Sequence, residues 1–315
     1  MKKIKKNFRC LFQMDPLEKL NLNSDSSVAL IKKGLYLGNK IWTAAPEKIS
    51  FSRKSAYVLA HQILDDKFNK GSLERICLDQ FDFFFIRQDP PFDINYLTNL
   101  YALELHNSFK KKPLFINHPS SIKNFTEKIF PFYFHDLMPY SVISSDEEVF
   151  KEIQKEHGTL VLKTLYNKGG EGIYKVQSIN QKSLSLFREM TNNHKTAIVI
   201  QVYIDEVKYG DKRVLLLDGE PMGVVNRVPQ KGEFKANLHL GGKAFKTSLT
   251  KKEKIICKRL SKTLKKSKLF FVGIDIINEK LTEINVTSPT GIVQLEELYK
   301  TDFCKVFWDK LFSLY

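Results

Sequence analysis

Short apolar runs alternate with helical stretches in the first part of the chain. Residues 8–14, 83–87 and 114–116 are apolar runs of strand length, and Asp93 precedes a helical pattern that extends toward Phe109. Apolar runs of this length between turn residues are typical of buried strands, and an Asp before a helix caps its first N–H groups. Strands and helices in alternation predict an α/β domain, which we place at residues 1–122.

Beyond residue 122 the pattern changes to strands that pair with their neighbours in the chain. The sequence Gly219-Glu220-Pro221 separates two apolar runs and indicates a hairpin. Two sequences of capping-box type, at 145–148 and 250–253, indicate helix starts. We divide this part into a central lobe, 123–204, and a C-terminal lobe, 205–315, so the expected class is α/β (α+β). The strands are predicted at 160–163, 173–176, 197–204, 213–218, 222–228, 270–277 and 281–286, before a C-terminal helix.

The segment from residue 229 to residue 243 has no clear periodicity. It contains Gly232, Asn237, Gly241 and Gly242. An unpatterned connection this long in a compact domain usually has a function, often as a lid. We predict a lid that keeps water away from a reactive intermediate.

The composition is that of a folded protein with an excess of basic residues. Apolar residues make up 43% and aromatic residues 12% of the chain, and the formal net charge is +15. A basic surface is typical of nucleic-acid binding, and it also attracts nucleotides and carboxylates. A lysine-rich amino-acid usage is a third explanation. Because the lysines are spread along the chain, we expect no nucleic-acid partner, and no apolar run is long enough to predict a membrane partner.

Cysteine spacing gives no sign of a metal or disulfide framework. Cys10, Cys77, Cys257 and Cys304 lie far apart and form no Cys-x-x-Cys pair. A disulfide framework is not expected in a chain of this size, so we predict a cytoplasmic location. Gly-x-Ser-x-Gly and His-Glu-x-x-His are absent, which argues against the common serine hydrolases and zinc proteases.

A glycine-rich sequence between two predicted strands is suited to binding an anion. Residues 167–172 (NKGGEG) match neither a Walker A loop nor a dinucleotide fingerprint. Glycines free backbone N–H groups to surround an anion, although an ordinary turn can have the same sequence. Lys163 lies in the apolar strand before the loop, where burying an ammonium group is costly without an anion. Loop and lysine together favour phosphate binding.

The last predicted hairpin brings two carboxylates together. Alternation turns Asp275 to one face and commits its apolar neighbours to the core. If residues 278–280 connect the strands, Asp275 lies opposite Glu283, with Asn285 on the same face. Like charges at opposed positions are destabilising, whereas an oxygen-only set suits Mg²⁺ bound with nucleotide phosphates. A solvated acidic hairpin is the alternative.

Two arginines are expected to be neighbours in the hairpin of residues 213–228. Arg213 begins one strand and Arg227 lies near the end of the other. Guanidinium groups hold carboxylate and phosphate oxygens bidentately, which would place these oxygens at the hairpin. A pair of edge-strand charges is the alternative.

Four segments in order carry a resemblance to a known family. They are residues 87–93 (RQDPPFD), 211–214 (DKRV), 272–277 (VGIDII) and 281–290 (LTEINVTSPT). Through them the chain resembles the bacterial glutathione synthetases of the ATP-grasp superfamily. The resemblance implies an ATP-grasp fold with an N-terminal α/β substrate domain. It also implies a homotetramer that ligates γ-glutamylcysteine to glycine through an acyl phosphate, with ATP as co-substrate and Mg²⁺, or Mn²⁺ in its place, as cofactor.

The resemblance also implies roles for single residues. Catalytic roles fall to Arg213, Arg227 and Lys163, and metal binding falls to Asp275, Glu283 and Asn285. ATP would meet Lys128, Lys163, Gly169, Gly170, Gly172, Gln201, Tyr203, Ile204 and Asp211. γ-Glutamylcysteine would meet Asp15, Arg87, Asn285, Ser288, Pro289 and Thr290.

The chain departs from the family pattern mainly in the predicted lid. Lys231, Lys235, His239 and Leu240 stand where relatives often have glycine, arginine or small residues, which leaves lid kinetics and glycine affinity open. Residues 38–80 match poorly and receive no assignment. An ATP-grasp ligase with a different acceptor, a basic nucleic-acid-binding protein and a relative that binds ATP without turnover are the alternatives.

Overall fold

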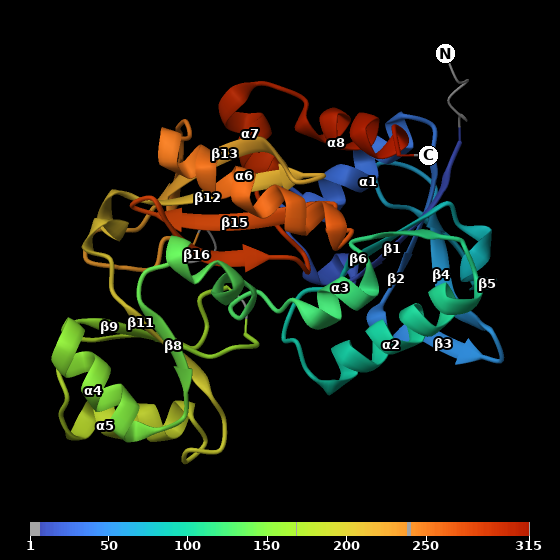
Figure 1. Ribbon diagram of the computed structural model, residues 1–315. Coiled ribbons are helices and arrows are strands. Elements are labelled where there is room, and N and C mark those ends of the chain that lie inside the picture. The colour runs from blue at the N-terminus through green and yellow to red at the C-terminus, as the bar shows by residue number, and fades with distance from the viewer. Residues whose placement is uncertain (1–6, 168, 238–240, 315) are drawn as a thin grey trace.

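The computed structural model describes residues 7–167, 169–237 and 241–314. They form three β-sheets with helices packed on them (Figure 1). The sheets follow one another along the chain, and the mixed class predicted from the sequence is confirmed. Within the described residues, five short 3₁₀ helices connect the main elements: η1 Leu17–Lys19, η2 Pro46–Lys48, η3 Leu78–Gln80, η4 Phe130–Leu137 and η5 Asp205–Tyr209.

The N-terminal sheet has seven strands in the order β3-β4-β2-β1-β6-β7, with β5 on β4. Its strands β2, β1, β6 and β7 are parallel, so the loops after their carboxyl ends meet at one edge. Residues 38–80, left unassigned from the sequence, contain four of the strands. The bounds are β1 Arg9–Met14, β2 Lys40–Ala44, β3 Ile49–Ser52, β4 Ser55–Ile63, β5 Lys70–Cys77, β6 Phe83–Arg87, β7 Leu114–Ile116, α1 Ser26–Tyr36, α2 Ile94–Phe109 and α3 Pro119–Asn124.

The central sheet has four antiparallel strands in the order β10-β9-β11-β8. Its two helices pack through stacked rings of Phe150 and Phe187, whose centroids lie 4.7 Å apart. The capping box predicted at 145–148 is wrong, because the helix is capped by Asp146, whose side chain accepts from Glu148 N, and not by a Ser145–Glu148 pair. The bounds are β8 Ser141–Ser144, β9 Leu160–Lys163, β10 Ile173–Val176, β11 Ile198–Val202, α4 Glu147–His157 and α5 Gln181–Met190.

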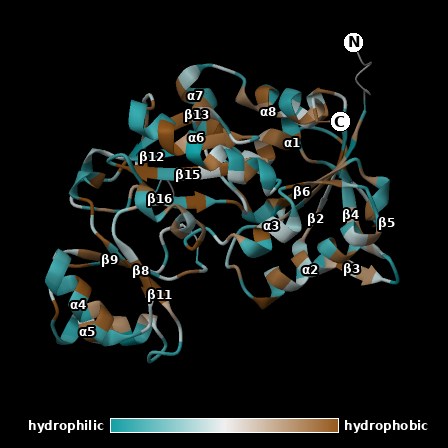
Figure 2. Cartoon of the chain, viewed as in Figure 1, coloured by the Kyte–Doolittle hydropathy of each residue, from teal (hydrophilic) through white to brown (hydrophobic). Residues whose placement is uncertain are grey.

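The C-terminal sheet has five strands in the order β14-β13-β12-β15-β16. One face is covered by α6, whose predicted capping box between Thr250 and Glu253 is confirmed. Figure 2 shows hydrophilic and hydrophobic positions together along α6, as expected of a surface helix. The bounds are β12 Asp211–Leu217, β13 Glu220–Val228, β14 Lys243–Lys246, β15 Phe271–Ile277, β16 Lys280–Asn285 and α6 Lys251–Lys266.

The chain ends in two helices where the sequence predicted one. Helix α7, Ile292–Tyr299, stops at Lys300 in the left-handed conformation, and α8, Phe303–Phe312, follows. Both helices contact α1, α8 lies beside it in Figure 1, and Trp308 Nε1 donates to the Leu30 carbonyl at 2.9 Å. The C-terminal helices therefore tie the last sheet to the first. None of the helices in the described ranges has the length and apolar character to cross a membrane.

Candidate active site

A cavity of about 790 Å³ is lined by residues of the central and C-terminal sheets and by the loops that follow β1 and β6 of the N-terminal sheet. Most of the residues predicted as site residues reach it. Those that line it are Asp15, Lys128, Lys163, Gly169, Gly170, Gln201, Tyr203, Ile204, Asp211, Arg213, Arg227, Asn237, Asp275, Glu283, Asn285, Ser288 and Thr290. The predicted residues outside the lining are Arg87, Gly172, Gly232, Gly241, Gly242 and Pro289.

The hairpin of β15 and β16 forms one wall and carries the two predicted carboxylates. Asp275 pairs with Glu283, as predicted, but the connection differs from the expected three residues. Only Asn278 and Glu279, both with positive φ, form the turn, and an extra residue bulges from β16. The bulge falls at Thr282, whose hydroxyl donates to the Asp275 carbonyl at 3.1 Å. Without the bulge, a two-residue turn would place Thr282 opposite Asp275.

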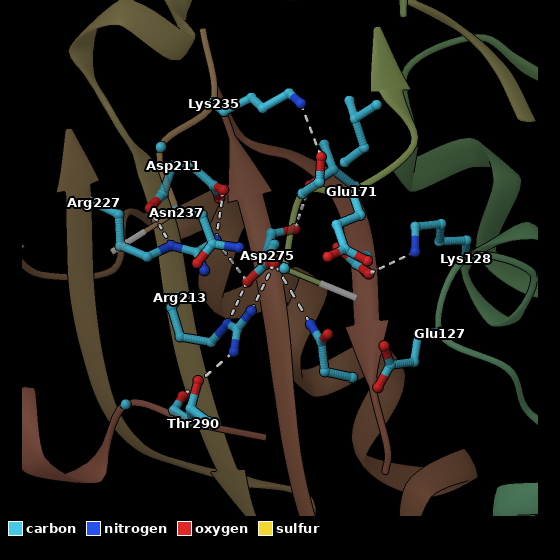
Figure 3. Close-up of a pocket in the computed structure, with 18 of the residues that line it drawn as sticks. Glu127, Lys128, Glu171, Asp211, Arg213, Arg227, Lys235, Asn237, Asp275 and Thr290 are labelled. Atoms are coloured by element: carbon cyan, nitrogen blue, oxygen red, sulfur yellow. Dashed lines mark hydrogen bonds and ion pairs between the residues drawn. The ribbon is translucent and has the colours of Figure 1, made fainter. Parts of the chain in front are cut away.

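Both predicted arginines bind Asp275 (Figure 3). Arg213 lies opposite Asp275 in the ladder, and its Nε and Nη2 donate to the two carboxylate oxygens at 2.5 and 2.9 Å. Arg227 Nη2 lies 3.0 Å from Asp275 and donates to Asp211 at 2.5 Å. Burial would raise the pKa of Asp275, but the two guanidinium groups outweigh it and hold that pKa well below its usual range. The arginines are thus neighbours, as predicted.

Two lysines face the cavity from different elements. Lys128 is 5% exposed, and its Nζ donates to the Asn167 carbonyl at 2.6 Å and lies 3.7 Å from Glu283. Lys163 ends β9, and burial lowers the pKa of its ammonium group. Glu127 precedes Lys128 and was not assigned from the sequence. Burial, together with repulsion from Glu283, raises the pKa of Glu127 to about 7.

The glycine loop joins β9 and β10 as a hairpin tip, as the sequence predicted. Gly169, Gly170 and Gly172 all have positive φ. A Cβ on Gly172 would come within 2.1 Å of Thr164 Oγ1, so this position accepts only glycine without rearrangement. Lys168 lies outside the described residues. Gly169 and Gly170 line the cavity, where their backbone is available to an anion.

The described part of the predicted lid crosses the cavity. Phe234 lines it and contacts the ring of Tyr203 edge-on, with centroids 6.4 Å apart. The next residue, Lys235, donates from Nζ to the Gly170 carbonyl at 2.9 Å (Figure 3). The lid segment thereby touches both the glycine loop and the wall of the central sheet. His239 and Leu240, two of the positions that depart from the family pattern, lie outside the described residues.

Two of the three lid glycines, Gly241 and Gly242, lie where the lid folds back on itself. Gln230 Nε2 donates to the Gly241 carbonyl at 3.3 Å, and Gly242 N donates to the Asn237 carbonyl at 3.2 Å. A Cβ on Gly242 would come within 2.4 Å of a backbone oxygen, whereas one on Gly232 would meet nothing within 4 Å. Gly241 and Gly242 therefore close the loop on itself, and only Asn237 of the four predicted lid residues faces the cavity.

The loops after β1 and β6 supply the N-terminal wall. Asp15 lines the cavity, but Arg87 lies behind it, 4% exposed. Arg87 donates from Nε to Ser27 Oγ at 2.9 Å and from Nη2 to the Pro289 carbonyl at 3.0 Å. It ties α1 to the turn after β16, whose Ser288 and Thr290 face the cavity. These contacts position the wall.

Several residues that line the cavity were not predicted as site residues from the sequence. They are Lys19, Asn21, Ser24, Asp25, Asp89, Glu127, Phe234 and Gln294. The first four lie between β1 and α1, and Asp89 follows β6. The signal that could have found these five is their place after the carboxyl ends of parallel strands, where ligands usually bind.

The donor atoms suit the magnesium that the resemblance implies. Asp275, Glu283 and Asn285 offer only oxygen ligands, and Asn285 Nδ2 lies 3.5 Å from Asp275 Oδ2. Within the described residues, no group of three or more His, Cys, Asp or Glu side chains could hold a metal ion alone. A small set of this kind suits a cation that nucleotide phosphates help to bind.

Two family models together match most of the chain. The prokaryotic glutathione synthetase N-terminal domain matches residues 8–123, and the prokaryotic glutathione synthetase ATP-grasp domain matches residues 127–300. The chain belongs to the prokaryotic glutathione synthetase family. Within this family it is 39% identical over 305 residues to the glutathione synthetase of Bradyrhizobium diazoefficiens, covering 95% of this chain and 96% of that one. It is 36% identical over 302 residues to that of Mesorhizobium japonicum, covering 94% and 96%.

Solved structures place the chain in the ATP-grasp fold. D-cycloserine synthetase DcsG aligns with a TM-score of 0.67 at 12% identity, over 96% of this chain and 99% of that one. D-alanyl-alanine synthetase A from Vibrio cholerae aligns with a TM-score of 0.64 at 13% identity, over 98% of both chains. At these identities the likeness concerns the fold alone. The fold predicted from the sequence is confirmed.

Proposed function

We infer that the chain acts as a glutathione synthetase, which joins γ-glutamylcysteine to glycine at the expense of ATP. The observation that supports this function is the arrangement of charged side chains in the cavity of a chain that belongs to this family. Asp275 and Glu283 are opposed on one hairpin, two arginines bind Asp275, and Lys128 and Lys163 face the same cavity. This arrangement of fixed charges suits a phosphoryl transfer between two anions.

In the proposed reaction the cysteinyl carboxylate of γ-glutamylcysteine attacks the γ-phosphorus of ATP. ADP leaves, and an acyl phosphate forms. Lys128, Lys163 and Arg213 lie where they can offset the charge that develops. Arg213 Nη1 makes only a 3.3 Å contact with the Thr290 carbonyl, so this nitrogen keeps donor capacity for a substrate oxygen.

Glycine's amine then attacks the carbonyl of the acyl phosphate. The tetrahedral oxyanion collapses with loss of inorganic phosphate and gives glutathione. Arg227 would stabilise the oxyanion together with backbone N–H groups. The lid segment, which lies over the cavity at Phe234 and Lys235, would keep water from the acyl phosphate.

Mg²⁺ would be held by Asp275, Glu283 and Asn285 together with the nucleotide phosphates. It would supply charge neutralisation during phosphoryl transfer. The ATP-grasp ligase PsnB, whose solved complex contains Mg and ADP, aligns with a TM-score of 0.61 over 98% of both chains. Mn²⁺ is expected to replace Mg²⁺.

For the remaining substrate contacts we keep the roles that the family resemblance implies. Gln201, Tyr203, Ile204 and Asp211 would surround the adenosine part of ATP, and all four line the cavity. Asp15 and the turn 288–290 would receive γ-glutamylcysteine. Gly232, Asn237, Gly241 and Gly242 would belong to the lid. The homotetramer, the cytoplasmic location, the absence of nucleic-acid and membrane partners, and the three-part division at residues 122 and 204 stay predictions.

Coupled release of ADP tests the function. γ-Glutamylcysteine and glycine are added singly and together at fixed ATP and Mg²⁺. We expect rapid ADP release only with both substrates, and glutathione as the product. If the pair gives no turnover while another amine or acid does, the chain is an ATP-grasp ligase with a different acceptor and the proposed substrates are wrong.

A further inference from the structure

Lys163 reaches the cavity with a single hydrogen-bond partner in the described part of the chain. Its Nζ donates to Gln201 Oε1 at 2.8 Å. Strands β9 and β11 are antiparallel, with Val199 opposite Lys163 and Gln201 opposite Val161. Gln201 therefore lies diagonally across from Lys163 on the same face of the sheet.

The amide of Gln201 has a defined orientation. A lysine ammonium group only donates, so the amide oxygen must face Lys163 and the amide nitrogen must face away. The nitrogen donates to Ser141 Oγ at 2.8 Å, and this hydroxyl donates to the Pro139 carbonyl at 2.8 Å. Ser141 is the direct ladder partner of Gln201. Each heteroatom of the 4%-exposed side chain is thus already bonded within the protein.

The ammonium group is held but not neutralised. Its partner is a neutral amide, and no described carboxylate lies within ion-pair distance of Lys163. Glu283, Asp211 and Asp275 act on Lys163 only through the electrostatic field, and Lys128 opposes them. A partly buried ammonium group without an ion-pair partner is suited to binding an anion in the cavity.

We propose that Gln201 is a positioning residue for the nucleotide phosphates: anchored by Ser141, it holds the ammonium group of Lys163 at the cavity without neutralising its charge. The inference rests on the proposed function, because it takes ATP as the occupant. It assigns to the Gln201 side chain a role toward the phosphates. The adenine base would then be bound by the surrounding backbone and apolar side chains.

Affinities for three ligands that differ in their number of phosphates test this role. Dissociation constants for ATP, ADP and adenosine are measured by competition with a fluorescent adenine nucleotide, for the wild type and Gln201→Met. Hydrogen bonds to charged groups are strong, so we expect ATP to bind roughly tenfold more weakly to the variant. ADP should lose less, and adenosine should bind unchanged.

Two further variants separate the role from a general loss of fold. Ser141→Ala removes the anchor alone and should weaken ATP binding in the same pattern by a smaller factor. Gln154→Met makes the same change on α4, where the half-buried side chain bonds only the Gln177 carbonyl, at 3.1 Å. We expect this control to bind all three ligands as the wild type does. Melting temperatures of all variants are measured alongside, and Ser141→Ala decides if Gln201→Met does not fold.

The outcome that overturns the inference is equal weakening of adenosine and ATP, or a changed preference for ATP over inosine triphosphate. Either result would show that Gln201 reads the base. Unchanged ATP binding in both Gln201→Met and Ser141→Ala would also overturn it. A wild-type protein that binds no ATP would instead contradict the proposed function itself.

Discussion

At the residue scale, the centre of the site is a buried carboxylate shared by two arginines. Asp275 lies on β15 between Arg213 on β12 and Glu283 on β16, so the sheet register alone brings these groups together. Removing one partner of such a pair leaves the others buried without compensation. The site residues are therefore coupled, and single substitutions should have effects larger than one lost contact.

Asp275→Asn should abolish most of the activity. The amide keeps the shape but removes the charge that fixes both arginines and would help to hold the metal. We expect the rate of glutathione formation to fall by roughly a hundredfold or more, in line with the loss of fixed charges at other active sites. Glu279→Gln, in the exposed turn of the same hairpin, is the matched control. Similar activity in the two variants would contradict the assigned role of Asp275.

Glu127 should make stability depend on pH. Its pKa is about 7 in the folded chain, against 4.5 as the ordinary value. Between these values only the folded state binds the proton, so the free energy of unfolding falls as the pH rises from 4.5 to 7. Below pH 4.5 Glu127 is protonated in both the folded and the unfolded state, and above pH 7 its contribution to the free energy of unfolding is fully lost.

Glu127→Gln removes this titration and keeps an acceptor for the Thr287 hydroxyl, which donates to Glu127 at 2.6 Å. Relative to the wild type, the variant should gain stability as the pH rises through that window. Denaturant unfolding at several pH values measures the gain. A difference between variant and wild type that does not change with pH would exclude a raised pKa.

At the element scale, the glycine loop depends on backbone conformations that side chains rarely adopt. Gly172 combines a positive φ with a close approach to Thr164, whereas Gly158 at the end of α4 has a positive φ and open space. A backbone conformation with positive φ alone costs a residue other than glycine about 1–3 kcal/mol. A comparison of the two positions therefore isolates the effect of the close approach.

Gly172→Ala should raise the KM for ATP, because the loop must shift to admit a Cβ. Gly158→Ala should lower stability by about 1–3 kcal/mol, because the φ of 75° and ψ of −123° at Gly158 strain any other residue, and it should leave the KM for ATP unchanged. Steady-state kinetics and thermal unfolding of both variants measure these effects. An equal KM for ATP in the two variants would show that the shape of the loop does not affect nucleotide binding.

The sequence predicted the elements whose pattern is local. Alternation in β15 and the tendency of neighbouring strands to pair were enough to place Asp275 opposite Glu283. The turn was one residue shorter than expected, and the bulge at Thr282 restored the register. A bulge leaves no simple pattern in one sequence, so this compensation could not be predicted. None of the four strands in residues 38–80 was assigned. Strand β3 alternates between apolar and polar residues but has only four residues, and β5 mixes polar and apolar residues without a regular alternation.

The burial of Arg87 also needed the structure. Sequence resemblance implied a contact with substrate, but Arg87 donates hydrogen bonds to Ser27 and Pro289, which come from opposite ends of the chain. Contacts between residues so far apart depend on how the sheets pack together. The same is true of Gln201, whose bond to Lys163 joins two strands that are not neighbours in sequence.

At the scale of the whole molecule, the two ends of the chain hold the cavity walls together. Helix α8 packs on α1, and Trp308 is fully buried there among the aromatic residues of the N-terminal sheet. Because α1 follows the loop with Asp25, which lines the cavity, the packing of α8 supports the N-terminal wall. The stability of the fold and the shape of the site are therefore linked.

Trp308→Ala should destabilise the protein by about 3–5 kcal/mol, the usual cost of deleting a large buried aromatic side chain. Val306→Ala, on the exposed side of the same helix, should change stability by less than about 0.5 kcal/mol. Denaturant unfolding measures both. A small loss in Trp308→Ala would mean that α8 contributes little to the packing of the first and last sheets.

Isotope transfer tests the central claim most directly. γ-Glutamylcysteine labelled with ¹⁸O in both oxygens of its cysteinyl carboxylate is incubated with glycine, ATP and Mg²⁺, and the products are analysed by mass spectrometry. Reaction through an acyl phosphate predicts glutathione that keeps one ¹⁸O in the new amide and inorganic phosphate that carries the other. Unlabelled phosphate, or ADP release without glutathione, would contradict the account.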